Sequence, residues 1–526
     1  MPSIRSLLLA YAVLNAVLYS MLLPLWEGFD EPFHFGYVQQ LANGQGFPDA
    51  RTARLSQEVW QSILSAPASD PVKSNLPEYF SWPAERRSQI QQGLRDIPRS
   101  ARSKLSDASN YEALQAPLAY APLAVAERLL ANVALPTRVL LLRVFAALAG
   151  VLLLFAAASA LCAELAIAEP YRDLVLFCVL SSQMTWATLA HVANDWLAVP
   201  LAVWTLVFLM RAASSPSVTR LAVASILLAA GLLTKAYFLA LVPVLLCIAA
   251  LRGKLREFAV SAAVLLACAG PWYIRNWRLY HALTGTQEER AGIGPAQVVH
   301  AAFALNWPGV ILTSVRGALW TANNTFRSFS LPTMNLLIAL CGAALLFWIF
   351  SRHSMREWIV VAYCAVFGLA DAYPAVETYI GTHNPFSTPS AWYAQVLVAP
   401  LLALLFLGTA RRPKAGKFLA LAIALLFGYI LAATYLVKLI PLYAGFEGRA
   451  SLKDIAVEYF LRFHALSANL NSVALGSATW IFILTLAVAA LIVVLEIGFI
   501  REILACTKSS SYSAPAPRPS SSAPSS

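Results

Sequence analysis

The sequence predicts an all-α, polytopic integral membrane protein of about 11 to 13 transmembrane helices, with 12 the preferred count, because each crossing needs ~20 mostly apolar residues. The 526 residues are 59% hydrophobic and only 12% charged, whereas about 25% of residues are charged in soluble proteins. The mean hydropathy is +0.64. Eleven apolar runs have lengths near one crossing. This composition excludes a cytosolic enzyme, a disordered protein and a disulfide-stapled secreted module.

The predicted spans follow one another along the chain with short breaks. The first run follows Arg5 and has no small-residue cleavage site, so we expect a retained helix and not a signal peptide. One later run, 219–251, is long enough for two short spans that turn near Thr234-Lys235. The predicted spans are 6–26, 139–162, 172–190, 195–210, 219–251, 257–273, 332–350, 357–373, 391–410, 418–438 and 476–500.

Short basic loops predict the orientation, because Lys and Arg collect on the cytoplasmic side of a membrane. The same bias accounts for the formal charge of +11, so no nucleic-acid partner is expected. With an even number of crossings between neighbouring basic loops, all of these loops and both termini are expected on the cytoplasmic side of the membrane. These loops carry Arg211 and Arg220; Arg252, Lys254 and Arg256; Arg352 and Arg356; Arg411, Arg412, Lys414 and Lys417; and Arg501 and Lys508.

Four loops are then expected on the outer side, 26–138, 274–331, 374–390 and 439–475. The first of them holds 12 of the 27 acidic residues of the chain. Its segment 116–135 is apolar but contains two prolines and a Glu-Arg pair, and a full crossing there would invert every later basic loop. We therefore expect an interfacial or re-entrant helix. Residues 1–508 form one domain in this prediction, followed by a low-complexity, disordered tail (509–526).

The first of four polar clusters at the outer boundary follows the first span and contains Asp30, Glu31 and His34. Pro32 suits the first position of a helix that ends at Asn43-Gly44. One carboxylate could simply cap this helix. Two adjacent carboxylates in an aromatic setting are more than a cap needs. One of them could have a raised pKa and act as a general base.

The second cluster, His191 with Asn194-Asp195, opens the fourth span. Asp195 could cap the helix of that span. It could also supply a second carboxylate that faces Asp30, for a metal ion or for sugar hydroxyls.

The third and fourth clusters supply cations. Lys235 and Tyr237 lie at the predicted hairpin tip, where the ammonium either extends to the interface or neutralises a phosphate at headgroup depth. Arg275 and Arg278 stand just outside a span, against the charge bias. They indicate an anionic partner, unless they belong to a Trp/Tyr belt with incidental arginines. Carboxylates beside cations suit a reaction in which a lipid-linked phosphate leaves.

These motifs, in their order, resemble the GT-C superfamily of polytopic glycosyltransferases, with its lipid A aminoarabinose transferases, protein O-mannosyltransferases and RgtA-like bacterial enzymes, and with related uncharacterised bacterial membrane proteins. The resemblance covers roughly residues 1–400. Two positions depart from the family pattern, Ala116 in place of a proline, and Ser390-Ala391-Trp392-Tyr393, where many relatives have an Arg-Tyr pair. The matching motifs are Asp30-Glu31-Pro32-x-His34, Gln115-x-Pro117-Leu118-x-Tyr120, Asn194-Asp195, Leu232-Leu233-Thr234-Lys235 and Trp272-Tyr273-Ile274-Arg275-Asn276-Trp277.

The resemblance implies an inverting glycosyltransferase that moves a sugar from a polyprenyl-phosphate donor to a glycan, lipid or protein acceptor. Asp30 would be the catalytic base, and Glu31 would orient it or the acceptor. No cofactor is certain; a divalent cation, held by Asp30 and Asp195, is left open because metal dependence differs among members. The substrate-binding residues would be His34, His191, Asn194, Asp195, Lys235, Tyr237, Arg275, Arg278 and Tyr393, with Lys235 and Arg275 on the phosphate.

Three other functions are compatible with the sequence. A transporter or flippase for a lipid-linked sugar would need polar groups at the bilayer midplane, whereas Arg143, Glu164 and Glu496 approach the spans only near their ends. A non-catalytic envelope assembly protein would tolerate loss of both Asp30 and Asp195. A ligase that moves a whole glycan from a lipid pyrophosphate would need the same cations and base.

Overall fold

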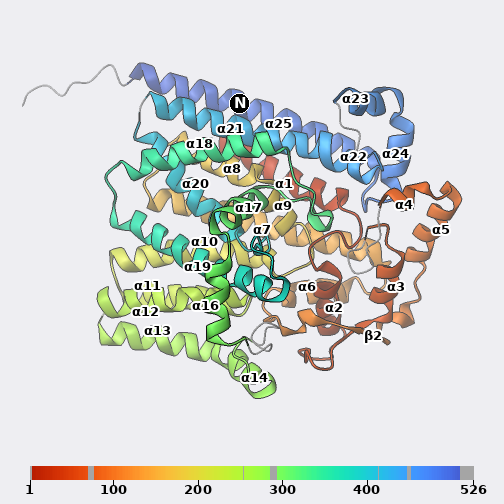
Figure 1. Cartoon of the computed structure of the whole chain (residues 1–526), viewed down its shortest axis with the longest axis horizontal. Coiled ribbons are helices and arrows are strands. Elements are labelled where there is room, and N and C mark those ends of the chain that lie inside the picture. The colour runs from red at the N-terminus through yellow and green to blue at the C-terminus, as the bar shows by residue number, and fades with distance from the viewer. Residues whose placement is uncertain are drawn as a thin grey trace, which may run out of the picture.

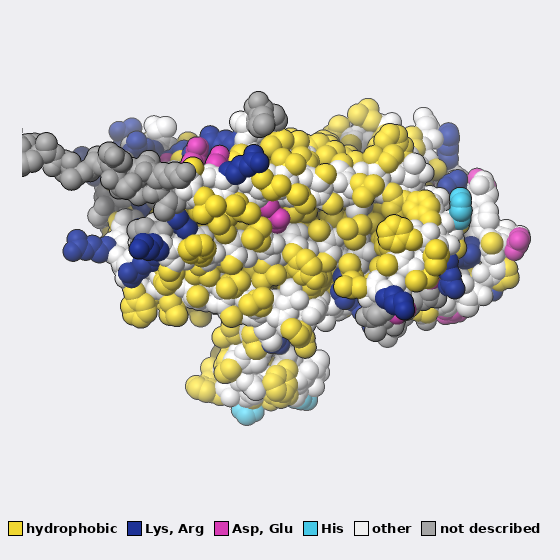
Figure 2. Space-filling view, turned by 90° about the horizontal axis from the view of Figure 1, so that it is seen from above, with side chains coloured by type: hydrophobic (Ala, Val, Ile, Leu, Met, Phe, Trp, Pro, Cys, Tyr) yellow, Lys and Arg dark blue, Asp and Glu magenta, His cyan; other side chains and the backbone are white. Residues whose placement is uncertain are grey.

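The computed structural model describes residues 3–68, 76–252, 254–284, 293–412, 414–446 and 452–509. It confirms the expected helical, multi-pass membrane architecture. The predicted disordered tail lies, beyond Ser509, outside the described residues. Figure 1 shows long helices side by side, with the elements of the first outer loop together at one end. Lys and Arg gather toward the two ends of the face in Figure 2, with a largely hydrophobic band between them.

Within the described residues, seven helices are each long and apolar enough to cross a membrane. All seven coincide with predicted spans. They are α1 (Ile4–Leu22), α7 (Leu135–Glu164), α10 (Asp195–Ser214), α18 (Leu331–Ile349), α19 (Met355–Thr382), α21 (Ala415–Ala433) continued through η6 (Thr434–Leu439) and α22 (Ile440–Tyr443), and α25 (Ala478–Ser509).

The other five predicted spans fall on shorter helices, so the count of 12 stays a prediction. Two of these spans are broken, at Ser182 and, with a bend of 52°, between Cys268 and Gly270. The helices concerned are α8 (Tyr171–Ser181) with α9 (Gln183–Leu189), α11 (Val218–Leu232), η4 (Ala236–Leu241) with α12 (Val242–Arg252), α13 (Leu255–Cys268) with α14 (Gly270–Tyr280), and α20 (Gln395–Ala410).

Ion pairs join the helix ends that the basic loops place in the cytoplasm. Glu164, the last residue of α7, accepts a hydrogen bond from Arg211 Nε at 2.7 Å and lies 3.4 Å from Arg356. Glu357 lies 2.9 Å from Arg411. These residues come from four different membrane helices or the turns beside them. Their contacts put the predicted inner connections at one end of the bundle, as the predicted orientation requires.

The outer loop 26–138 folds into short elements, and it departs from an all-α fold in one small sheet. Strand β1 (Arg54–Ser56) pairs antiparallel with β2 (Leu105–Ser109). The segment expected to be interfacial contains α6 (Tyr120–Leu129), which spans only ~15 Å and is too short to cross. The remaining elements are α2 (Glu31–Ala42), α3 (Gln57–Ser65), α4 (Leu76–Ser81), α5 (Ala84–Arg95), η2 (Arg99–Arg102) and η3 (Tyr111–Leu114).

A buried charge network fastens this loop to α7. Arg138 forms ion pairs with Glu58 and Glu127, and Gln39 donates to Glu58 at 2.6 Å. All four side chains are buried. Because one cation meets two carboxylates from α3 and α6, the loop elements are held in a fixed position on the membrane helices.

The other outer loops are also helical. Two helices in 274–331 form an apolar pair bent by 86°. The predicted loop 374–390 is shorter than expected, because α19 continues past Pro374 to Thr382; membrane helices tolerate an internal proline. At 28 residues α19 is ~42 Å long, more than the ~30 Å hydrocarbon core, so its end projects outward. The loop elements are α16 (Pro295–Ala304), α17 (Trp307–Leu319), η5 (Asn323–Thr325), α23 (Leu452–Leu461) and α24 (Phe463–Asn471).

Candidate functional site

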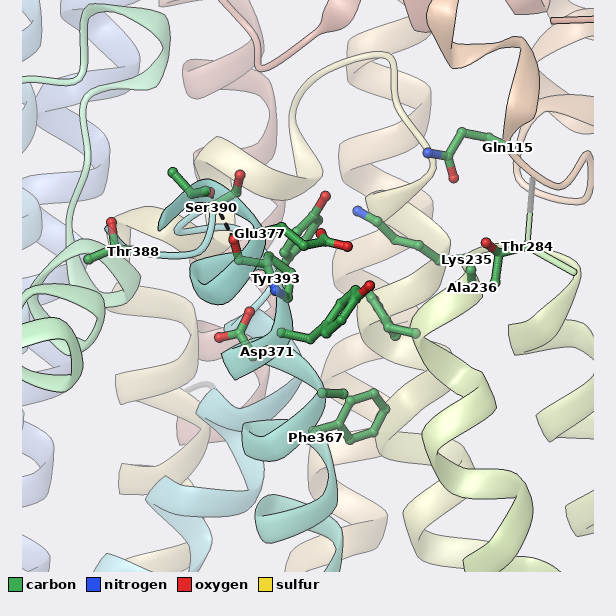
Figure 3. A pocket seen from close by; sticks show the side chains of 15 residues that line it. Gln115, Lys235, Ala236, Thr284, Phe367, Asp371, Glu377, Thr388, Ser390 and Tyr393 are labelled. Carbon is green, nitrogen blue, oxygen red and sulfur yellow. Dashed lines mark hydrogen bonds between the residues drawn. The ribbon is translucent and has the colours of Figure 1, made fainter. Parts of the chain in front are cut away.

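A cavity of about 680 Å³ lies beside the hairpin between α11 and η4 (Figure 3). The hairpin turns at Thr234-Lys235, as predicted, since α11 ends at Leu232 and η4 begins at Ala236. The outer half of α19 forms the opposite wall. The lining residues are Gln115, Lys235, Ala236, Tyr237, Thr284, Phe367, Ala370, Asp371, Tyr373, Pro374, Glu377, Thr378, Thr388, Ser390 and Tyr393.

Lys235 reaches into this cavity from the hairpin tip. Its Nζ lies 2.5 Å from Asp195 Oδ1, 5.0 Å from the centre of the Tyr393 ring and 5.6 Å from that of Tyr237. Lys235 and Asp195 are both buried. An ammonium has three donors, and Asp195 takes one of them. The remaining two, in an aromatic setting that stabilises a cation, can bind an anion in the cavity.

The predicted motif segments, far apart in sequence, meet at this hairpin. Asn194 Nδ2 donates to Gln115 Oε1 at 3.1 Å and to the Thr234 carbonyl at 3.2 Å. The Leu118 N–H donates to the Leu233 carbonyl at 2.9 Å. Tyr273 of α14 donates to the Leu232 carbonyl at 3.1 Å. Together with the 2.7 Å hydrogen bond between His34 Nδ1 and Tyr120 Oη, these contacts join all five motifs.

Asp30 stands at the start of α2 in a left-handed conformation, with φ of 55°. Its side chain does not cap the helix, so a role as a helix cap does not explain this residue. Tyr111 Oη donates to Asp30 Oδ1 at 2.5 Å. Aspartate is one of the few residues besides glycine that adopt this conformation, and here it directs the Asp30 side chain toward Tyr111.

Glu31, the neighbour of Asp30, points elsewhere. It is fully buried and forms a two-point ion pair with Arg143 of α7, with Nε 2.7 Å from Oε1. Its Oε1 also accepts the Val192 N–H at 3.0 Å. Arg143 donates in addition to the carbonyls of Leu23 and Pro24. These contacts of Glu31 position the start of α2 and thereby Asp30, and neither of the two acids is part of the cavity lining.

Replacing Glu31 with Ala should strongly destabilise the protein, because it leaves Arg143 buried without its carboxylate partner. Breaking a buried ion pair on one side costs about 3–5 kcal/mol. The melting temperature of the protein in detergent measures the effect. The double variant Glu31→Leu/Arg143→Met removes both charges and should lose less. A Glu31→Ala variant that melts like the wild type contradicts this role.

Glu112, which the sequence analysis did not select, belongs to the same site. Burial, and next the charge of Asp30, raises its pKa to about 8, and Lys235 and Asp195 also act on it electrostatically. His34 Nδ1 lies 3.4 Å from Glu112 Oε2 and 2.7 Å from Tyr120 Oη. Burial lowers the pKa of His34 well below its usual value. Near neutral pH the site therefore holds a protonated Glu112 and a neutral His34.

Glu112→Gln should remove a pH dependence of stability. Between the ordinary pKa of 4.5 and about 8, the folded protein holds a proton on Glu112 that the unfolded chain releases. This contribution is fully present below pH 4.5 and is lost as the pH rises through 8. The melting temperature of the wild type should therefore fall more between pH 5 and pH 9 than that of Glu112→Gln. Parallel curves for the two proteins would show that Glu112 does not hold this proton.

His191 and Asn194 bring buried polar atoms that lack partners. Neither ring nitrogen of His191, nor Asn194 Oδ1, has a hydrogen-bond partner in the part of the chain that the structure describes. Both residues are at most 1% exposed. Phe29 lies against His191, with ring centres 6.3 Å apart, and stacks on Trp392 at 4.3 Å. Buried polar atoms are normally paired, so these atoms are candidates for contact with a bound molecule.

The structure does not bring the two predicted arginines into the cavity lining. Arg275 donates to the Pro48 carbonyl at 2.6 Å and lies over the Trp272 ring at 4.8 Å. Arg278 is exposed. Among the predicted site residues, Lys235, Tyr237 and Tyr393 line the cavity. The others lie outside its lining: Asp30, Glu31, His34, His191, Asn194 and Asp195.

Sequence reasoning missed Asp371 and Glu377 of α19 as well as Tyr111 and Glu112. Asp371 stands inside a predicted span, and an acid in an apolar run indicates function by default. The expectation that charges approach the spans only near their ends was therefore incomplete. Tyr111 and Glu112 directly precede the Gln115-x-Pro117 motif, which is the signal that could have identified them.

No group of three or more His, Cys, Asp or Glu side chains within the described ranges could hold a metal ion. Asp30 and Asp195 thus lack a third side-chain ligand of these types among the residues placed by the structure.

No protein-family model and no curated protein matches the sequence. Among solved structures, the chain is similar to the crystal structure of ArnT from Cupriavidus metallidurans bound to undecaprenyl phosphate. The TM-score is 0.47 and the sequence identity 15%, over 94% of this chain and 77% of that chain.

Proposed function

We propose that the protein is an inverting glycosyltransferase at the periplasmic face of a bacterial inner membrane. It transfers a sugar from a polyprenyl-phosphate donor to an acceptor hydroxyl. One observation carries the proposal: motif segments from across the chain converge beside the cavity that Lys235 lines, and the charges of Asp30 and Lys235 both act on the buried Glu112 carboxyl group. The acceptor is a glycan, a lipid or a protein with a free hydroxyl.

Lys235 holds the donor phosphate in this proposal. The phosphodiester carries one negative charge, and a second develops on the phosphate as the bond to the sugar breaks. The ammonium therefore stabilises the transition state more than the bound donor, which is what accelerates a reaction. The hydrogen bond to Asp195 fixes the position of the ammonium beside the cavity.

Asp30 takes the proton of the acceptor hydroxyl. The acceptor oxygen bonds to the anomeric carbon while the bond from that carbon to the phosphate oxygen breaks, and the electron pair leaves with the phosphate. Tyr111 orients the Asp30 carboxylate through its 2.5 Å hydrogen bond. Because Glu112 is protonated, no second negative charge stands close to Asp30. Asp30 can therefore stay ionised, as a general base must. His34, His191 and Asn194 contribute further contacts to the substrates.

Release of polyprenyl phosphate tests the function. Purified protein in nanodiscs is given a synthetic polyprenyl-phosphate sugar together with an envelope extract as the acceptor source, and the products are measured by mass spectrometry. We expect release of polyprenyl phosphate that needs both the protein and the extract. A ligase would act instead on a pyrophosphate donor and release the pyrophosphate.

A transporter is the second candidate, because Asp371 lies within a membrane helix, where acids are typical of transport pathways. In liposomes, a transporter would move the labelled lipid between leaflets without releasing polyprenyl phosphate. That outcome would replace the proposed transfer reaction.

A further inference from the structure

The cavity walls carry opposite charges. Lys235 reaches in from the hairpin, while Asp371 and Glu377 reach in from α19 on the other side (Figure 3). Three hydroxyl-bearing side chains, Thr378, Thr388 and Ser390, line the cavity with the two acids. Neither acid belongs to any of the motifs described above, so this wall has no assigned role in the reaction.

Asp371 is placed to meet a ligand. Its Oδ1 is buried from water and has no hydrogen-bond partner among the residues that the structure describes. The Tyr237 hydroxyl, which lines the same cavity, is likewise without a partner there. A carboxylate oxygen accepts hydrogen bonds and a phenol can donate one. A sugar hydroxyl could thus donate a hydrogen bond to Asp371 and accept one from Tyr237.

The charges also fix which end of a donor lies where. A phosphate carries negative charge, so it is attracted to Lys235 and repelled by the α19 wall. The sugar must then lie toward Asp371 and Glu377. Two like charges in a partly buried site repel each other more strongly than they do in water, whereas a sugar hydroxyl can donate a hydrogen bond to either acid.

We infer that one wall of the cavity is the subsite for the donor sugar and that it selects a hydroxyl-bearing sugar without an anionic group. This α19 wall consists of Asp371, Glu377 and Thr378 of α19 together with Thr388 and Ser390 of the segment that follows α19. This inference rests on the proposed function, since it assumes that Lys235 binds the donor phosphate. A uronic acid or a phosphorylated sugar is excluded by the two carboxylates.

Binding of two matched probes tests the inference. The probes are short-chain polyprenyl-phosphate glucose and polyprenyl-phosphate glucuronic acid, which differ only in the carboxylate of the sugar. Dissociation constants are measured by calorimetry on the full chain in detergent. We expect the wild type to bind the glucose probe at least tenfold more tightly. In the isosteric variant Asp371→Asn/Glu377→Gln this preference should shrink to threefold or less.

A control variant, Glu85→Gln/Asp107→Asn, removes two acids that are exposed in the first outer loop. It should keep the preference of the wild type, which separates a local effect from a change in net charge. Equal binding of the two probes by the wild type would overturn the inference without any variant. A preference for the glucose probe that is unchanged in Asp371→Asn/Glu377→Gln would also overturn the inference.

A third probe, decaprenyl phosphate, separates this inference from the proposed function. If its affinity depends on Lys235 but the two sugars are not distinguished, the sugar subsite is wrong and the donor cavity stands. If decaprenyl phosphate binds equally well to the wild type and to Lys235→Met, the cavity is not a donor site and both proposals fail.

Discussion

Asp30→Asn should lower the rate of sugar transfer at least 100-fold, since general bases contribute roughly 10²–10⁴-fold to catalysis. Asparagine has nearly the same shape as aspartate but cannot take up the acceptor proton. Its Oδ1 can still accept the hydrogen bond from Tyr111, so the protein should fold normally. Transfer is measured as release of polyprenyl phosphate, and folding as melting temperature and yield.

The matched control for this variant is Asp107→Asn, an exposed acid of the same loop, which should retain full activity. Near-normal transfer by Asp30→Asn would remove Asp30 from the role of base. A loss of activity that is accompanied by an equally large loss of folded protein would show that Asp30, with its left-handed backbone conformation, has a structural role and not a catalytic one.

Loss of the Lys235 ammonium should mainly weaken donor binding. A hydrogen bond to a charged group contributes about 1.5–3 kcal/mol, so the dissociation constant of decaprenyl phosphate should rise ~10- to 150-fold. Lys235→Ala alone leaves Asp195 buried and unpaired, which also destabilises the protein. Lys235→Met/Asp195→Asn removes both charges and keeps the volume, so it isolates the effect on binding.

Lys104→Met, in the exposed part of the first outer loop, is the control for the loss of a positive charge. Its affinity for decaprenyl phosphate should equal that of the wild type. If both Lys235 variants bind decaprenyl phosphate as tightly as the control does, Lys235 does not hold the phosphate.

The membrane architecture could be predicted because hydrophobicity is a local property of the chain. Each apolar run coincides with a helix, and the turn at Thr234-Lys235 falls where a polar pair interrupts the run 219–251. The location of the basic loops at one common end of the bundle could also be predicted, since charges at helix ends can be read from the sequence. The contacts of Glu164 with Arg211 and Arg356 then follow.

The division of labour between Asp30 and Glu31 could not be predicted. The two acids are neighbours in sequence, but Asp30 lies in a left-handed conformation and Glu31 turns toward Arg143, 112 residues away. No local pattern identifies Arg143 as that partner. The same holds for Arg275, whose position over Trp272 is set by packing of α14 and not by the charge bias.

The structure of the protein with decaprenyl phosphate bound tests the central claim most directly. We predict a phosphate within about 3 Å of Lys235 Nζ, with Asp30 on the opposite side of the position of the sugar. A phosphate bound away from Lys235, or at the end of the bundle where Glu164 and Arg211 meet, would contradict the account.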